Sequence, residues 1–123
     1  MTKFFDVVMA DVRRILKGQY LIREKEESTE MYFVKEGTFG VFKIKGDNEV
    51  QIESIYSGEI VGEMSFLDEA PRSASVKALI DSEVIVVPRD KFDDFMNSLP
   101  PWFTAMIHTL TERLRKANAR IRV

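Results

Sequence analysis

Apolar and polar residues alternate with a period of two over most of the chain between Gly18 and Val87. Such alternation is typical of strands that bury one face. Turn-forming residues interrupt it at short, regular intervals, and Gly46-Asp47-Asn48 has the composition of a hairpin turn. Short strands at this spacing predict an antiparallel barrel or roll. The predicted strands cover Tyr20 and Ile22, Met31 to Val34, Phe39 to Ile44, Val50 to Ile55, Ser75 to Leu79 and Glu83 to Val87.

The two ends of the chain follow a helical pattern instead. Apolar residues near helical spacing predict an N-terminal helix over residues 1–11, but periodicity leaves open whether residues 12–16 continue it or form a strand. After Pro88, apolar side chains at Phe92, Phe95 and Met96 share one helical face. Leu99-Pro100-Pro101 ends that helix, because proline cannot continue it.

A last helix is predicted from Pro101, since proline suits the first helical turn. After Phe103, its apolar residues recur in steps of four and three, as in a helix that packs against a second helix. This seam predicts either packing on the chain's own roll or a homodimer, and the two arrangements can coexist. The seam residues are Ile107, Leu110, Leu114, Ala117 and Ile121.

Composition excludes several classes of function. The 123 residues include no cysteine and only one histidine, His108, so thiol chemistry and a histidine-cluster metal site are excluded, and no covalent or metal cofactor is expected. No serine–histidine or paired-carboxylate arrangement stands out, so a non-catalytic protein is predicted. A net charge of −2 gives no general attraction to nucleic acid. Since no apolar run approaches the ~20 residues of a membrane span, a cytoplasmic location is expected.

The stretch 62–78 has the chemistry of a small anion site. Gly62 lets the backbone approach a ligand closely, and a following helical turn would present unpaired N–H groups. Arg72 adds a planar fork of donors that suits a phosphate. Glu63 only accepts hydrogen bonds when ionised, so it suits a hydroxyl group such as that of a ribose.

The order of these residues, GEMSFL, then DEA, PR, SAS and VKA, resembles the phosphate-binding cassette of the cyclic nucleotide-binding domain family. The resemblance implies a mainly β fold with flanking helices: an eight-stranded antiparallel β-roll (double-stranded β-helix or jelly roll) with an N-terminal helix, a short cassette helix and two C-terminal helices. It favours a strand over residues 12–16. A single domain is expected over 1–123, with the N-terminal helix at 1–11, the roll at 12–88, its cassette at 62–78 and the C-terminal helices at 89–123.

The sequence departs from the family pattern in one turn. Many members have a glycine after the second strand, where this chain has Lys25 or Glu26. The turn is expected to lie far from the cassette, so that the change affects local geometry more than ligand binding.

The resemblance also implies roles for individual residues. Arg72, Ser73, Met64 and Ser65 would bind the ligand phosphate, Glu63 and Gly62 its ribose, and Val41, Ile52, Arg113 and Asn118 would form the base pocket. Alternatives remain open: Arg72 pairing with Asp68 or Glu69, Glu63 pairing with Arg72, and ordinary core positions for Val41 and Ile52. In the family a threonine at the position of Ser73 often accompanies cGMP recognition, so serine favours cAMP.

The implied function is regulatory: binding of a cyclic nucleotide, with cAMP favoured over cGMP, moves the C-terminal helices. One alternative is a ligand-free β-roll that serves as a dimerisation or scaffold module. Another is the sensor domain of a transcription regulator that acts through a separate partner. Since no recognition helix follows the roll in this chain, direct DNA binding is not expected. A metal-dependent barrel enzyme is disfavoured by the near absence of histidine.

Overall fold

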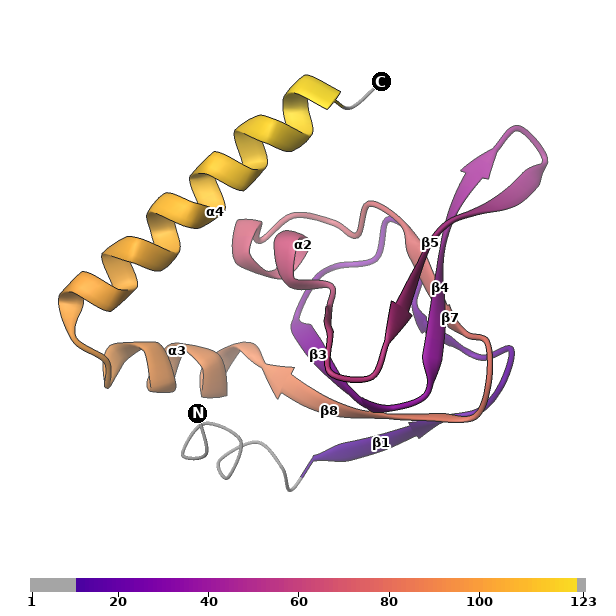
Figure 1. Ribbon diagram of the computed structural model, residues 1–123, viewed down its shortest axis with the longest axis horizontal. Helices are drawn as coiled ribbons and strands as arrows, with labels where there is room; N and C mark the ends of the chain where they lie inside the picture. Colours follow the sequence, from indigo (N-terminus) through magenta and orange to yellow (C-terminus); the bar gives the residue numbers. More distant parts are fainter. Residues whose placement is uncertain (1–10, 122–123) are drawn as a thin grey trace.

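The computed structural model describes residues 11–121, with side chains described as far as Ala117. These residues form two four-stranded antiparallel sheets that lie face to face, followed by two helices (Figure 1). The first sheet has the order β1-β8-β3-β6 and the second β2-β7-β4-β5. The strands are β1 (Val12–Ile15), β2 (Tyr20–Ile22), β3 (Glu30–Glu36), β4 (Thr38–Lys45), β5 (Asn48–Tyr56), β6 (Ile60–Val61), β7 (Ser75–Ala78) and β8 (Ser82–Pro88).

The predicted mainly β fold of eight antiparallel strands is confirmed for the described residues. The segment that periodicity left open forms β1, which pairs with β8. Gly46 and Asp47 connect β4 to β5, with Gly46 at φ +66°, so the predicted hairpin is also confirmed. The N-terminal helix predicted over residues 1–11 lies outside the described residues, apart from Asp11.

Strand β8 is covered on both faces, which explains its unbroken apolar sequence. Val84 and Val86 face the other sheet and belong to the main core with Val34 and Phe39. Ile85 and Val87 face the other way, into a second core cluster with Met31 and Phe66, against which Phe33, Leu67 and Phe92 pack. β8 therefore connects the interior of the roll to the helices outside it.

Three helices are described: α2 (Glu63–Asp68) within the roll, then α3 (Arg89–Asn97) and α4 (Pro101–Ile121). The predicted break at Pro100 and the start of the last helix at Pro101 are both confirmed. α3 continues directly from β8, and α4 then turns back and rises past α2 (Figure 1). No helix among residues 11–121 is both long and apolar enough to cross a membrane.

Much of the predicted α4 seam faces away from the roll. Leu110 and Leu114 are 53% and 47% exposed, and Ala117 is exposed as well. Ile107 is half-buried on the side of α2 and α3. The start of the seam therefore contacts the chain's own helices, while its later residues have an exposed face.

Candidate functional site

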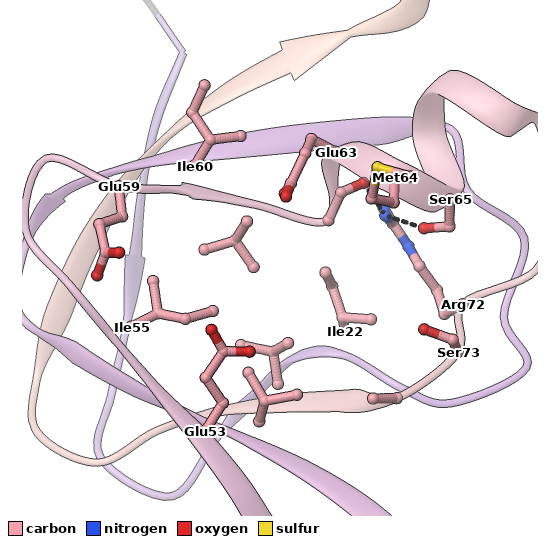
Figure 2. A pocket seen from close by; sticks show the side chains of 15 residues that line it. Ile22, Glu53, Ile55, Glu59, Ile60, Glu63, Met64, Ser65, Arg72 and Ser73 are labelled. Carbon is pink, nitrogen blue, oxygen red and sulfur yellow. Dashed lines mark hydrogen bonds between the residues drawn. The ribbon is translucent and has the colours of Figure 1, made fainter. Parts of the chain in front are cut away.

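A cavity of about 290 Å³ opens between α2 and the second sheet (Figure 2). The cassette forms one wall, and strands β4 and β5 form the opposite wall. It is lined by Ile22, Val41, Glu53, Ile55, Glu59, Ile60, Val61, Gly62, Glu63, Met64, Ser65, Arg72, Ser73, Ala74 and Val76. All six cassette residues that the sequence assigned to phosphate and ribose are therefore brought together around one hollow.

Gly62 is the N-cap residue of the cassette helix and is required there on two grounds. Its φ is +77°, a left-handed conformation that side chains disfavour. A Cβ atom at this position would also lie 2.6 Å from Nη1 of Arg72 and 2.9 Å from Cδ1 of Ile22. The glycine thus allows the arginine to lie directly against the first turn of α2.

Arg72 is only 6% exposed, and its guanidinium is held by the cassette itself. Nη1 donates to the carbonyl oxygen of Gly62 at 2.9 Å and to Oγ of Ser65 at 3.0 Å, while Nη2 donates to the carbonyl oxygen of Glu30. Burial lowers the pKa of Arg72, although it stays far above neutrality because arginine is always charged in proteins. These bonds and one to the side chain of Tyr32 hold the guanidinium in a fixed position and leave part of its five-donor capacity for an anion.

The alternative partners considered for Arg72 bind other cations. Asp68 accepts a hydrogen bond from Arg115, and Glu69 lies 4.0 Å from Arg89. Among the described residues, Glu63 makes no hydrogen bond or ion pair with Arg72 either. Burial raises the pKa of Glu63 and the nearby Glu53 raises it further, while a hydrogen bond from its own backbone N–H and, to a smaller extent, the charge of Arg72 oppose the shift. Glu63 is thus a half-buried acceptor that faces the cavity.

The turn at Lys25 and Glu26 contacts the cassette directly, and the expectation that it lies far away is wrong. Lys25 N–H donates to the carbonyl oxygen of Arg72 at 2.8 Å, and Arg72 N–H donates to that of Glu26 at 2.8 Å. The cause is the pairing of β2 with β7, which brings the end of β2 alongside the cassette; Glu24 N–H, for instance, donates to Oγ of Ser75. The turn positions the main chain of the arginine.

Of the three predicted base-pocket residues whose side chains are described, Val41 lines the cavity and Ile52 and Arg113 do not. Ile52 is 51% exposed and lies outside it. The hairpin begins with Lys45 opposite Asn48, a register that would place Val41 opposite Ile52. A β-bulge inserts one extra residue at Ile52, so Val41 lies opposite Glu53 instead. Glu53 is accordingly a cavity residue that sequence reasoning missed, and the bulge has no signature in the local sequence.

The two predicted base contacts on α4 are Arg113 and Asn118, and the structure describes the side chain of Arg113 alone. Arg113 is exposed and does not line the cavity, and the side chain of Asn118 lies outside the description. α4 is instead joined to α2 by the ion pair between Arg115 and Asp68. Residues two apart lie on nearly opposite faces of an α-helix, so this pairing turns the face of Arg115, and not that of Arg113, toward the cassette helix.

The cassette helix is also joined tightly to α3. The ring of Phe66, which is fully buried, meets Phe92 edge to face at a centroid distance of 5.3 Å. Arg89 stacks 4.1 Å above the Phe66 ring and donates to the Phe66 carbonyl oxygen. On this side of α2, a second cavity of about 590 Å³ lies between the three helices. α2 thus separates the cassette cavity from the helical part of the molecule.

Comparison with known proteins agrees with this geometry. The family profile for the cyclic nucleotide-binding domain matches residues 12–98, so the chain belongs to that family. The cyclic AMP receptor protein of Thermus thermophilus is 30% identical over 103 residues, which cover 83% of this chain and 48% of that protein. Lysophospholipase NTE1 of Cryptococcus neoformans var. neoformans is 27% identical over 107 residues, which cover 87% of this chain and 7% of that protein. The chain thus spans half or less of the length of these relatives.

Solved structures show the same similarity. The catabolite activator protein of Thermus thermophilus matches with a TM-score of 0.78 at 27% identity, over 98% of this chain and 58% of that chain. The cAMP-bound form of the EAL enzyme Bd1971 gives a TM-score of 0.72 at 27% identity, over 89% of this chain and 29% of that chain. Its cGMP-bound form gives 0.74 at 25% identity, over 89% and 30%.

Proposed function

We propose that this chain binds a cyclic nucleotide, with cAMP favoured, and acts as a non-catalytic regulatory sensor module. The observation that carries the proposal is the convergence of Gly62, Glu63 and Arg72 on one cavity of about 290 Å³. The cavity combines a buried guanidinium with a half-buried carboxylate acceptor, Glu63, which is the combination that a phosphate joined to a ribose requires. The cAMP-bound and cGMP-bound forms of Bd1971 support the ligand class.

Each side chain has a distinct role in this proposal. Arg72 and the backbone N–H groups of Met64 and Ser65 would bind the cyclic phosphate, and Glu63 would accept the 2′-hydroxyl proton of the ribose. Ser73, exposed at the cavity, would donate to the phosphate or the base. Since the family often has threonine here with cGMP, the serine favours cAMP.

The contacts of α2 supply a route from ligand to output. A phosphate bound to Arg72 and to the first turn of α2 would pull on α2. The Phe66 ring of α2 packs against Phe92 of α3, so a shift of α2 would reach α3. The other end of α2 is bonded through Asp68 to Arg115 of α4. A ligand shifts such an arrangement only by its difference in affinity for the two positions of the helices.

Isothermal titration with cAMP and with cGMP tests the proposal. We expect saturable binding to the wild type and a loss of more than about tenfold in Arg72→Lys, because lysine keeps the charge but loses the planar fork. Arg72→Ala leaves several buried acceptors unpaired, so its folding must be checked by thermal melting. Arg14→Ala is the control: the side chain of Arg14 is exposed on β1, so the substitution should leave affinity unchanged. Absence of binding of either nucleotide at millimolar concentration would contradict the sensor and favour a scaffold.

A homodimer through α4 is a second part of the proposal, because Leu110 and Leu114 are large apolar side chains that are about half exposed. Steps of four and three place them on one stripe that a second copy of the helix can cover. Sedimentation equilibrium is expected to detect a dimer that Leu110→Glu with Leu114→Glu dissociates. Thr109→Glu, on the exposed surface of the same helix, is the control. A monomeric wild type at high concentration would contradict the dimer, and the output would then pass to a separate partner.

A further inference from the structure

Glu53 brings a carboxylate into the cassette cavity, and no feature of the cassette motif accounts for it. The residue lies on β5, directly opposite Val41 in the sheet register, and both line the cavity. In Figure 2 the Glu53 side chain rises from the strand toward the middle of the hollow, across from Glu63. The bulge at Ile52 causes this placement, and bulges beside binding sites commonly redirect a side chain in this way.

The three glutamates of the cavity differ in their partners. The Glu59 carboxylate accepts a hydrogen bond from the N–H of Tyr56 at 2.7 Å. Glu63 begins the cassette helix and is the expected acceptor for a ribose hydroxyl. Within residues 11–121, the Glu53 carboxylate has neither a hydrogen-bond donor nor a cation. Glu53 is therefore the acceptor that is left for another part of a ligand.

An unpaired carboxylate in a site for an anion carries an electrostatic cost. That cost is offset only if the ligand offers donors, because an ionised carboxylate accepts hydrogen bonds and never donates them. In a cyclic purine nucleotide the 2′-hydroxyl is the single donor outside the base. The remaining donors are the N–H groups on the edge of the purine, and Glu53 adjoins Val41 on the wall assigned to the base.

We propose that Glu53 is a specificity-determining residue that favours guanine over adenine in this cavity; the inference rests on the proposed function. The guanine edge presents N1–H and the 2-amino group side by side, and these two donors match the two oxygens of one carboxylate. Adenine presents its 6-amino donor next to N1, which is an acceptor and repels the second oxygen. Glu53 thus favours cGMP, whereas Ser73 favours cAMP. The relative size of the two effects determines which nucleotide binds more tightly.

The effect of Glu53→Gln on both nucleotides tests this assignment. A glutamine side chain offers one acceptor and one donor, which match the 6-amino group and N1 of adenine, as in bidentate readout of adenine by amide side chains. It can no longer accept from both N1–H and the 2-amino group of guanine. We expect the ratio of the Kd for cAMP to that for cGMP to fall by about tenfold or more. Cyclic IMP, which keeps N1–H and lacks the 2-amino group, should lose less affinity than cGMP.

Glu59→Gln is the matched control, because it removes the same charge from the same cavity while its amide oxygen can still accept from Tyr56 N–H. It should change both affinities alike. Glu53→Ala serves as a second variant, which loses the guanine contact without gaining one to adenine. If Glu53→Gln leaves the ratio of the two Kd values equal to that of Glu59→Gln while the wild type binds nucleotide, the role of Glu53 is overturned and the proposed function stands. If the wild type binds neither nucleotide, both are overturned.

Discussion

The main-chain N–H of Lys25 donates to the carbonyl oxygen of Arg72 at 2.8 Å, across a gap of more than forty residues in sequence. With the return bond from Arg72 N–H to Glu26, this pair fixes the backbone from which the guanidinium projects. Lys25 has a φ of +76°, a conformation in which its Cβ crowds the following carbonyl group. The turn that positions the arginine of the cavity therefore carries local strain.

Relief of that strain should stabilise the protein. We expect Lys25→Gly to raise the free energy of unfolding by about 0.5–1 kcal/mol, because the gain from removing Cβ exceeds the added entropy of the unfolded chain. Urea titration measures the change. Lys25→Ala removes the same charge and keeps Cβ, so it should stay near the wild type. Equal stability of the glycine and alanine variants would show that no strain is stored at this turn.

Gly62→Ala should impair both stability and binding. The new Cβ would meet Nη1 of Arg72 at 2.6 Å in a backbone with φ +77°. We expect a loss of about 2–4 kcal/mol, combining the left-handed backbone with the displaced arginine, and a large loss of nucleotide affinity. Gly46→Ala is the matched control, because its φ is +66° and no atom lies within 4 Å of its Cβ. It should show the backbone cost alone, and normal nucleotide binding by Gly62→Ala would contradict this account of the site.

Arg115→Ala should loosen α4 from the cassette helix. Its guanidinium bonds to Asp68 of α2 and to Glu112 of its own helix, so removal breaks the polar contact between α2 and α4. Faster amide hydrogen exchange is expected in the middle of α4, with a smaller difference from wild type at high salt because the pair is partly exposed. Arg113→Ala removes an exposed arginine two residues earlier and should leave exchange unchanged. Protection that is equal in both variants would mean that apolar packing alone holds α4.

Glu63 should make stability depend on pH. Burial raises the pKa of Glu63 in the folded state above its usual value of 4.5, so the native state binds a proton that the unfolded state releases. By linkage, stability falls as pH rises from the unfolded pKa through the folded pKa, and it stays lower at neutral pH. Glu63→Gln should therefore be more stable than wild type at pH 7, and this advantage should disappear below pH 4.5. Glu27→Gln, at an exposed position, is the control for the loss of one charge.

The cassette could be predicted from the sequence because its chemistry is contiguous. Its key residues, Gly62, Glu63 and Arg72, lie within one short segment. Their separation in sequence therefore limits how far apart they can lie in the fold. The strands were predictable for a related reason, since alternation is a local property. Even the break between α3 and α4 is set by a local pair of prolines.

The base pocket could not be predicted because it depends on relations between distant segments. Because of a single bulged residue, Glu53 lines the cavity at the place where the regular register would put Ile52. The sequence of neither strand alone predicts this bulge. The position of α4 is likewise set by Arg115 meeting Asp68, which selects one helical face among several that are chemically similar. The role of Arg89 as a link between α3 and the Phe66 carbonyl was missed for the same reason.

The cassette helix is bounded by left-handed residues at both ends, Gly62 at φ +77° and Glu69 at φ +53°. A residue in the left-handed conformation does not continue a right-handed helix, so the six residues between them form a separate short helix. The chain changes direction at each of its ends. The two cavities, of about 290 and 590 Å³, are lined by different ends of this helix: the first by its first turn and the second by Leu67 and Glu69. A rotation of α2 about Gly62 and Glu69 would change the shape of both cavities, so a molecule bound in one would alter the space available in the other.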